Sequence, residues 1–366
     1  MIEPANPSSA DAMDGDPPEV LARRDGSVGH LTLNRSSAFN ALSLGMVRSI
    51  DAALDAWAAD PQVAVILLDG AGDRAFCAGG DIRALYEAAR IGDYAVMSDF
   101  FREEYRLNAR LARFSKPIIA MMDGITMGGG IGLGAHASHR VVTERSVLAM
   151  PEVRIGFAPD VGGTYLLSHA PGELGLHLGL TGARLDAADA LLCGLADVHV
   201  RSDRLHEMQR GLAQCRTSEE VRACLDAFAA VPAPGRLAEA RDWIDRCYAA
   251  DTVEAILAAL EQAPEPEARA AAAEIVGNAP TSLKVTLRAL RQACDLDLGA
   301  CLDREFHVSC SITRRPDFIE GVRAAVVDKD RAPRWQPAQL SEVGPQDVAR
   351  HFGSIDGEDL GLAADT

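Results

Sequence analysis

Apolar runs of strand length alternate with helical stretches through residues 19–200, and this alternation constrains the fold most. Residues 63–70 read VAVILLDG, a continuous apolar run that ends in glycine and is typical of a strand covered on both faces. Further strands and helices are predicted around it at 42–58 (helix), 82–90 (helix), 94–114 (helix), 117–122 (strand) and 139–144 (strand). The alternation predicts an α/β core whose strands are joined by helical crossovers.

Four regions follow from the patterning. Residues 1–18 are rich in Pro, Ala, Ser and Asp and are predicted to be a disordered leader. The α/β core covers 19–200 and begins with a hairpin, since Asp25-Gly26 supplies a tight turn between the runs 20–24 and 28–33. A region with only helical periodicity covers 201–340, and a polar tail that we expect to fray covers 341–366.

Composition excludes several classes of function. The chain has 36 Lys and Arg against 53 Asp and Glu, a formal charge of −17, which argues against a nucleic-acid partner. No stretch of 18 apolar residues occurs, so no membrane span is expected. The 8 cysteines form no CxxC pair and the histidines no HExxH motif, so neither a disulfide framework nor a metal is implied. With no signal-like leader, we expect a reducing cytoplasm.

Two glycine-rich segments each follow a predicted strand and open a predicted helix. They read FCAGGDIRAL at 76–85 and GITMGGGIGLGAH at 124–136. Glycines let a ligand approach the backbone, and free N–H groups at such turns can bind a phosphate or a developing oxyanion. The alternative is a pair of close-packed turns without a ligand. The spacing fits neither the dinucleotide-binding G-x-G-x-x-G pattern nor a P-loop.

Two acidic residues stand in apolar surroundings after the second turn. Glu152 lies in AMPEVRIG and Asp160 in FAPDVGG. A carboxylate among apolar side chains is costly to bury unless it is paired or used in chemistry. Asp160 has a structural alternative, because Asp is a favoured N-cap and a helix is predicted from about Gly162.

At these residues the sequence resembles the crotonase (enoyl-CoA hydratase/isomerase) superfamily. The segments that carry the resemblance occur in the family's order and are HLTLNRSSAFNALS, FCAGGDI, GGGIGL, MPEVRIGFAPDVGGTYLL and LTGARLDAADALLCGLAD. The resemblance implies a spiral of ββα turns with a C-terminal helical region, acting on CoA thioesters. Members of this superfamily often assemble as homo-oligomers, either trimers or hexamers, but the helical extension can change the packing, so the resemblance leaves the oligomeric state of this chain open.

Within the superfamily, the chain looks like the subgroup that hydrolyses short branched 3-hydroxyacyl-CoA thioesters. FFREEYRLN at 100–108, PDVGG, PTSLKVTLRAL and the segment 317–340 carry this likeness. It implies cleavage of 3-hydroxyisobutyryl-CoA, a step of valine breakdown. Hydratases of the superfamily have a first catalytic glutamate where this chain has Gly132, and adding water to a double bond needs two acid/base groups.

The resemblance also assigns roles to individual positions. Gly80 and Gly129 would donate the two N–H groups of an oxyanion hole to the thioester carbonyl. Glu152 would be the nucleophile or general base at the acyl carbon, and Asp160 would orient water and hold a proton. The sequence does not separate an anhydride intermediate from direct attack by water.

Two further positions are expected to contact the substrate. Glu104 matches an acyl-pocket position and would hydrogen-bond the substrate hydroxyl, although a glutamate on an amphipathic helix is often only a solvated residue. Arg83 would face the CoA phosphates by resemblance. Cys77 borders the first glycine turn and is interpreted as packing. No separate cofactor is expected, since CoA is part of the substrate.

Two other functions remain open from sequence. A lyase or isomerase would keep the same fold and oxyanion hole but would react at the double bond. A non-catalytic acyl-CoA-binding protein would keep the pocket alone, and the presence of Glu152 and Asp160 weighs against it.

Overall fold

The computed structural model describes residues 17–354 and 359–363. Most of the expected leader, residues 1–16, lies outside this range, and the described residues Pro17 and Pro18 are exposed. The ordered chain opens with the expected hairpin, formed by β1 (Val20–Asp25) and β2 (Val28–Leu33) in antiparallel register. Gly26 provides the positive φ of 60° at its turn.

A six-stranded sheet forms the first layer of the core, in the order β1-β2-β3-β5-β7-β9. All pairs after the hairpin are parallel, as predicted for strands joined by crossovers. The additional strands are β3 (Val65–Gly70), β5 (Ile118–Met122), β7 (His139–Val142) and β9 (Val198–His199).

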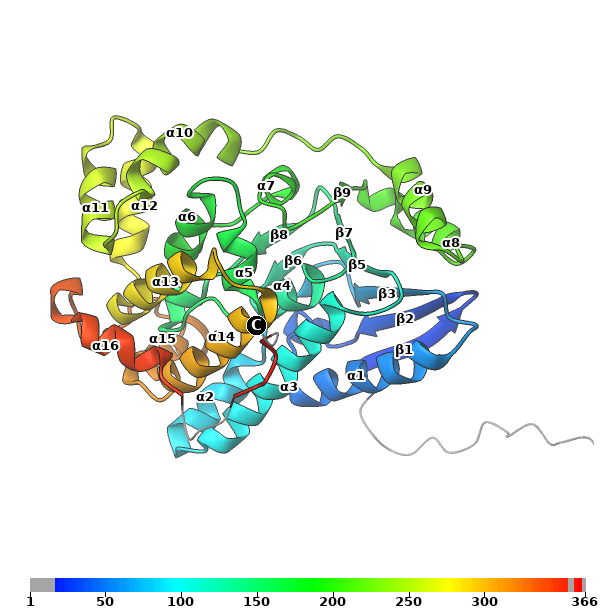
Figure 1. Cartoon of the computed structure of the whole chain (residues 1–366), viewed down its shortest axis with the longest axis horizontal. Coiled ribbons are helices and arrows are strands. Elements are labelled where there is room, and N and C mark those ends of the chain that lie inside the picture. The colour runs from blue at the N-terminus through cyan, green and yellow to red at the C-terminus, as the bar shows by residue number, and fades with distance from the viewer. Residues whose placement is uncertain (1–16, 355–358, 364–366) are drawn as a thin grey trace, which may run out of the picture.

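A second, three-stranded parallel sheet follows the order β4-β6-β8. Three strands of the long sheet, β3, β5 and β7, are each followed in the chain by one short strand and then by a helix or helical turn. The repeating units are β3, β4 (Ala75–Cys77), α2 (Ile82–Ile91); β5, β6 (Ile125–Met127), α4 (Gly129–Gly134); and β7, β8 (Val147–Ala149), η2 (Glu152–Ile155). The expected spiral of ββα turns is therefore confirmed (Figure 1).

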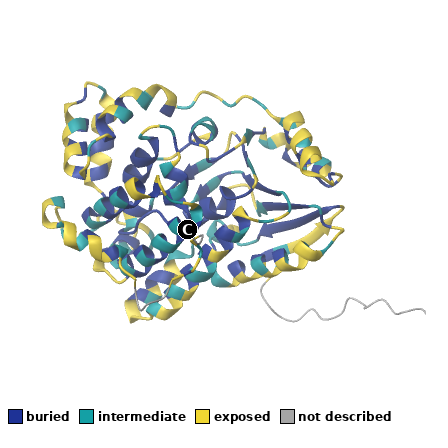
Figure 2. Ribbon diagram, viewed as in Figure 1, coloured by how far each residue is buried: buried dark blue, intermediate teal, exposed yellow. Residues whose placement is uncertain are grey.

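The long sheet is covered on both faces, as the apolar run at 63–70 predicted. Ile66 and Leu68 pack into the main core together with α1 (Leu44–Ala59). Val65 and Leu67 point the other way, because alternate residues of a strand face opposite sides, and join a second apolar cluster with α8 (Leu205–Leu212) and α9 (Ser218–Phe228). Residues of β2, β3 and β5 are accordingly mostly buried, whereas most of the edge strand β1 is exposed (Figure 2).

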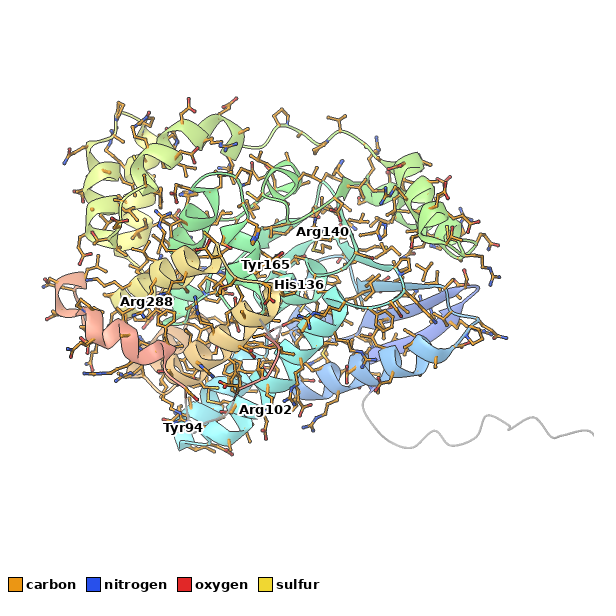
Figure 3. All side chains as sticks on the ribbon, viewed as in Figure 1. Tyr94, Arg102, His136, Arg140, Tyr165 and Arg288 are labelled. Carbon is orange, nitrogen blue, oxygen red and sulfur yellow. The ribbon has the colours of Figure 1, made fainter. Side chains whose placement is uncertain are left out.

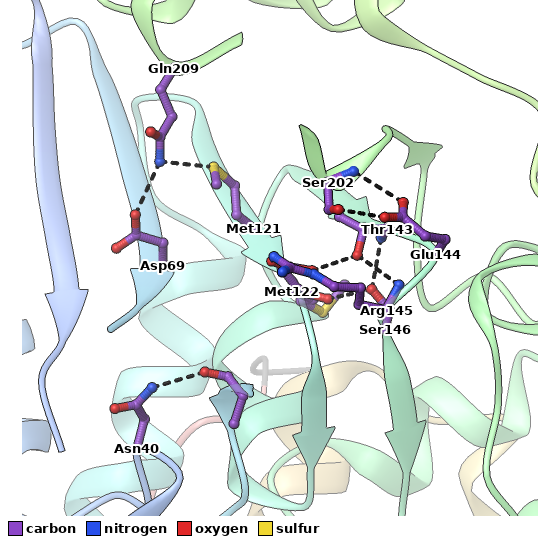
Figure 4. Close-up of polar contacts among 12 residues, drawn as sticks. Asn40, Asp69, Met121, Met122, Thr143, Glu144, Arg145, Ser146, Ser202 and Gln209 are labelled. Carbon is purple, nitrogen blue, oxygen red and sulfur yellow. Dashed lines mark hydrogen bonds and ion pairs between the residues drawn. The ribbon is translucent and has the colours of Figure 1, made fainter. Parts of the chain in front are cut away.

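Polar contacts hold α8 against the long sheet and hold the turn between β7 and β8, which connects the two sheets (Figure 4). Gln209 of α8 donates a hydrogen bond to Oδ2 of Asp69 at the end of β3, 3.1 Å away. In the turn between β7 and β8, the Ser146 hydroxyl donates to the Met122 carbonyl at 2.6 Å and accepts from the Thr143 amide at 2.7 Å. These bonds hold the turn that carries the chain from the long sheet to the short one.

Helices account for nearly all of the second half of the described chain. Two of them, α13 and α14, pack on α3, α5 and α6 of the first half, and side chains from both halves share the main apolar core. The helices not yet given are α3 (Tyr94–Ala112), α5 (Gly163–Ser168), α6 (Leu174–Thr181), α7 (Ala187–Leu192), α10 (Leu237–Tyr248), α11 (Val253–Gln262), α12 (Pro266–Val276), α13 (Pro280–Ala293), α14 (Leu298–Ile312) and α15 (Pro316–Val322).

The segment 341–366 differs from the expectation of a fraying tail wherever the structure describes it. It contains α16 (Pro345–Ala349), in which Val348 is buried, and a following turn in which His351 is buried and hydrogen-bonded through Nδ1 to the Ser311 hydroxyl at 2.9 Å. This segment packs against α13 and α14, and Val343 and Val348 join the main apolar core. Among the described helices, none is long and apolar enough to cross a bilayer.

Candidate active site

The two glycine-rich turns lie against each other. An ideal Cβ built on Gly129 would lie 3.1 Å from the backbone nitrogen of Gly80, and one built on Gly79 would lie 3.6 Å from the nitrogen of Gly129. Neither the Gly80 nor the Gly129 amide donates a hydrogen bond to a described residue. The structure thus brings together two free N–H groups from separate crossovers, as the sequence led us to expect.

Backbone conformation explains why glycines occupy these turns. Gly79 has a φ of 111° and Gly128 a φ of 48°, in the region that favours glycine. The first turn is held by Leu42, whose amide donates to the Gly79 carbonyl at 2.8 Å and whose carbonyl accepts from the Asp81 amide at 2.7 Å. Gly128 donates to the Ala149 carbonyl at 3.2 Å, and α4 begins immediately after it.

Gly132 sits in space that two other residues fill. A Cβ at this position would lie 2.6 Å from Cβ of Val161 and 2.9 Å from Nδ2 of Asn108. Any larger side chain would need those groups to move. The position that the resemblance matches to the first hydratase glutamate therefore has no acid here and no room for one.

Glu152 places its carboxyl group against the second glycine turn. It opens η2 and is only 6% exposed. Its Oε1 lies 2.9 Å from the position a Cβ would take on Gly128, and its Oε2 has no hydrogen-bond partner among the described residues. This carboxyl therefore lies against the residue that precedes Gly129, and one of its oxygens has no partner among the described residues.

Asp160 does not cap a helix with its side chain. The residue at the N-cap of α5 is Gly162, with no side-chain cap, and the Asp160 side chain instead accepts a hydrogen bond from the Tyr105 hydroxyl at 2.6 Å. Tyr105 also lies 2.7 Å from the hydroxyl of Ser309 on α14. Helices from both halves of the chain thus hold this carboxyl.

Glu104 is a buried residue of α3. It is 2% exposed, and its Oε1 lies 2.6 Å from the position a Cβ would take on Gly129 and has no partner among the described residues. Its neighbour Glu103 takes the surface position and pairs with Arg48 at 2.6 Å. The solvated-face alternative thus applies to Glu103 and is wrong for Glu104.

The three carboxyls share an environment that favours their neutral forms. Burial, reinforced by the nearby Asp160 charge, raises the pKa of Glu104 and of Glu152 well above the usual value. Burial raises the pKa of Asp160 to about 7, although the hydrogen bond from Tyr105 acts in the opposite direction. The group therefore holds protons near neutral pH and can both release and accept one.

Glu305 is a residue that sequence analysis missed. From α14 it accepts hydrogen bonds from the amides of Gly162 at 2.6 Å and Thr164 at 2.8 Å, which fixes the segment after Asp160. Burial raises its pKa to about 8 despite these donors. A signal was present, since Glu305 stands at helical spacing from Leu302 and Ser309, both buried.

The same segment is held from the other side by His136. The Nε2 atom of His136, a residue labelled in Figure 3, lies 2.8 Å from the Val161 carbonyl. Burial lowers the pKa of this imidazole to about 4, so that it is neutral. Val161 itself has a φ of 54°, a strained conformation for a β-branched residue. This strain directly follows Asp160 and is maintained by tight packing.

The remaining predicted positions lie around this centre. Arg83 is exposed on the first turn of α2 and forms no ion pair or hydrogen bond with a described residue through its side chain. Cys77 is fully buried, and burial raises the pKa of its thiol to about 12, so it remains protonated and serves as packing. The described chain has no cluster of three metal-binding side chains. The structure has one surface cavity beside Arg201 and another beside Arg315, and none of the predicted site residues lines either of them.

Comparison with known sequences extends the family resemblance to nearly the whole chain. The family described as enoyl-CoA hydratase/isomerase matches residues 28–352. The chain is 43% identical over 349 residues to a rat protein named 3-hydroxyisobutyryl-CoA hydrolase, mitochondrial, covering 93% of this chain and 90% of the relative. The human protein of the same name is 41% identical over 93% of this chain and 90% of the relative.

Solved structures give the same fold. A structure titled carnitinyl-CoA dehydratase from Mycobacterium thermoresistibile superposes with a TM-score of 0.88 at 47% identity, covering 93% of this chain and 98% of the other. One titled enoyl-CoA hydratase from Rhodobacter sphaeroides gives a TM-score of 0.87 at 42% identity, covering 93% and 99%.

The cytoplasmic expectation is wrong by this comparison, because the relatives are named as mitochondrial proteins. That expectation rested on cysteine usage and on the composition of the leader. Neither determines the fold or the site, and most of the leader, residues 1–16, lies outside the described residues.

Proposed function

Because the chain belongs to the enoyl-CoA hydratase/isomerase family, we propose that it hydrolyses 3-hydroxyisobutyryl-CoA to 3-hydroxyisobutyrate and CoA. Relatives at 41–43% identity over nearly their full length bear the name of this hydrolase. The observation that carries the proposal is that Glu152 lies against the second of two adjoining glycine turns, which carry two amides without a described partner, while position 132 has no acid. This arrangement suits chemistry at a carbonyl better than chemistry at a double bond.

The first part of the mechanism is polarisation of the thioester. The Gly80 and Gly129 amides donate to the carbonyl oxygen and stabilise the negative charge that develops on it. One such donor contributes about 3–4 kcal/mol to the transition state in other enzymes with oxyanion holes. Since both donors are backbone groups held by turns, they need little reorganisation during the reaction.

The second part is attack on the acyl carbon. Glu152 in its ionised form either bonds to that carbon or removes a proton from an attacking water. In the first route CoA leaves as a thiolate and takes up a proton, and water then cleaves the resulting anhydride. In the second, the tetrahedral intermediate expels the thiolate directly. Asp160, with a pKa of about 7, holds and returns the proton in either route.

Two further contacts complete the proposal. Glu104 bonds the substrate hydroxyl from its buried place beside Gly129. Arg83, exposed three residues after Gly80, pairs with a CoA phosphate, which a chain of formal charge −17 must bind through local cations. No separate cofactor takes part.

Hydration or dehydration of an enoyl-CoA is the second candidate, because the titles of similar solved structures name those activities. The packing at Gly132 weighs against it, since Val161 and Asn108 fill the space of the missing acid. A non-catalytic acyl-CoA-binding role is disfavoured because burying Glu152 and Asp160 destabilises the fold, and such a role gives no reason to keep them.

A paired assay tests the proposal. Release of free CoA thiol from 3-hydroxyisobutyryl-CoA is measured beside hydration of crotonyl-CoA, followed by loss of the conjugated double bond. Thiol release with little hydration is expected. Hydration without thiol release would show that the chain acts on the double bond of an enoyl-CoA. Binding of both esters without turnover would favour a non-catalytic acyl-CoA-binding role.

A further inference from the structure

Helices α3 and α4 pack against each other at the site, and two residues of α3 lie opposite two glycines of α4. On α3, Glu104 and Asn108 are four residues apart and so lie one above the other on one side of the helix. On α4, Gly129 and Gly132 are three residues apart and so lie on the same face of that helix. Oε1 of Glu104 lies 2.6 Å from a Cβ built on Gly129, and Nδ2 of Asn108 lies 2.9 Å from one built on Gly132.

Asn108 is the unexplained member of this arrangement. It is 0% exposed, yet neither Oδ1 nor Nδ2 has a hydrogen-bond partner among the described residues. Buried side-chain amides are almost always bonded, because an unbonded one is destabilising. Each exception calls for a specific explanation, such as strain, a catalytic role or a bound water or ion.

The other buried asparagines show what a structural role looks like in this chain. Asn40 donates to the carbonyls of Ala71 at 3.0 Å and Ala75 at 2.9 Å. Asn278 donates to the Leu180 carbonyl at 2.9 Å. Both connect neighbouring segments of backbone, whereas the Asn108 amide connects nothing within the described chain.

The pair of groups on α3 has the bonding pattern that an alcohol requires. A hydroxyl donates one hydrogen bond and accepts others. In its ionised form the Glu104 carboxylate can only accept, and Nδ2 of Asn108 can only donate. Four residues of α-helix rise about 6 Å, so one hydroxyl placed between the two side chains is within hydrogen-bond reach of both.

We propose that Asn108 is a specificity residue for the 3-hydroxyl group, donating from Nδ2 to the hydroxyl oxygen while the hydroxyl hydrogen is directed to Glu104. The inference rests on the proposed function and adds a residue to it. It also gives a reason for the glycine at 132, since a side chain there would occupy the space of the Asn108 amide. The packing of Asn108 against Gly132 then explains both why position 132 has no acid and how the hydroxyl is recognised.

The test compares two substrates that differ by a single hydroxyl, 3-hydroxyisobutyryl-CoA and isobutyryl-CoA. Asn108→Leu is expected to lower kcat/KM for the hydroxylated ester roughly 10-fold or more, as expected for loss of one hydrogen bond in a buried site. The value for isobutyryl-CoA is expected to change much less, so that the ratio of the two falls. Equal losses on both esters, or an unchanged ratio, would overturn the inference.

Asn278→Leu is the matched control, because it makes the same replacement at a buried amide that bonds the backbone. It is expected to lower the melting temperature and to leave the substrate ratio unchanged. Asn108→Leu is expected to keep or raise the melting temperature, since it removes an unbonded polar group. If Asn108→Leu does not fold, Asn108→Ala carries the same comparison with a smaller side chain.

Binding measurements separate failure of this inference from failure of the proposed function. If the parent protein releases thiol from neither ester, the proposed hydrolysis is wrong, and calorimetric titration with the same two esters then tests Asn108. Preference of the parent for the hydroxylated ester, lost in Asn108→Leu, supports the inference. Equal affinities of the parent for both esters contradict it.

Discussion

The hydroxyl of Tyr105 donates a hydrogen bond to Oδ2 of Asp160 across 2.6 Å, joining α3 to the loop before α5. The same hydroxyl lies 2.7 Å from Ser309 of α14. One phenol therefore connects the acidic centre to a helix from the second half of the chain. It also opposes the effect of burial on the pKa of Asp160, because a donated hydrogen bond stabilises the ionised carboxyl.

Tyr105→Phe tests the importance of that bond. Its removal is expected to raise the pKa of Asp160 further, so the pH at which kcat/KM reaches half its maximum should move upward. Activity at pH 7 is expected to fall roughly tenfold, since hydrogen bonds to charged groups contribute about 1.5–3 kcal/mol. The pH profile of thiol release measures both effects.

Tyr248→Phe is the control for this change, because Tyr248 is a buried phenol that bonds Nδ1 of His177 at 2.9 Å and has no contact with the carboxyls. It should reduce stability without moving the pH profile. The same upward movement in both variants would show that the profile reports on folding and not on Asp160.

Asp160→Asn is expected to act in the opposite direction on Glu152. The Asp160 charge contributes to the raised pKa of Glu152, so its removal should lower that pKa. Attack requires ionised Glu152, so the residual activity should reach its plateau at a lower pH than in the parent. Asp317→Asn, at a carboxyl whose pKa burial raises to about 6 near Gln336, is the control. If the pH profile of Asp160→Asn has the same midpoint as that of the parent, the charge of Asp160 does not influence the pKa of Glu152.

Gly132→Ala tests the packing that excludes an acid from this position. The new Cβ would lie 2.6 Å from Cβ of Val161, so the free energy of unfolding is expected to fall by about 1–3 kcal/mol. Gly277→Ala is the control, because its nearest neighbour would be 3.5 Å away, and a change within about 0.5 kcal/mol is expected there. Denaturant unfolding compares the two, and equal stability would mean that the site has room for a larger residue.

Glu305 is expected to make stability depend on pH. Its folded pKa of about 8 lies above the unfolded value near 4.3, so between these values the folded state holds a proton that the unfolded state has lost. The free energy of unfolding should therefore fall as pH rises from about 5 to 8, by at most about 1.4 kcal/mol per pH unit from this group.

Glu305→Gln checks this directly. It should lower stability at pH 5, because one of the Gly162 and Thr164 amides then faces an NH₂ group in place of an acceptor oxygen. It should also flatten the dependence on pH between 5 and 8. An unchanged slope in urea unfolding would mean that Glu305 is ionised throughout this range.

Local patterns were enough to predict the hairpin, the buried strand at β3 and the two glycine turns, because each depends on neighbouring residues. The identities of Glu104, Glu152 and Asp160 as site candidates came from residue type and family resemblance. Their closeness depends on crossovers that bring β4, β6 and η2 together, which the resemblance implied and the structure describes.

Other parts of the site depend on contacts between residues far apart in the chain. Glu305 meets Gly162 across 143 residues, and Ser309 meets Tyr105 across 204 residues, so no local pattern reports either pair. The folding of 345–352 was missed for a different reason. Its polar composition conceals a small buried set that includes Val348 and His351.

The central claim is that Glu152 attacks, or activates water to attack, the acyl carbon of a thioester held by two backbone amides. The most direct measurement is the rate of thiol release from 3-hydroxyisobutyryl-CoA by Glu152→Gln, with Glu103→Gln as a control for charge loss at a surface residue. Glu152→Gln should lose at least about 10²–10⁴-fold in kcat, in the range of a missing general base, while Glu103→Gln stays near the parental rate. Parental turnover by Glu152→Gln would contradict the account.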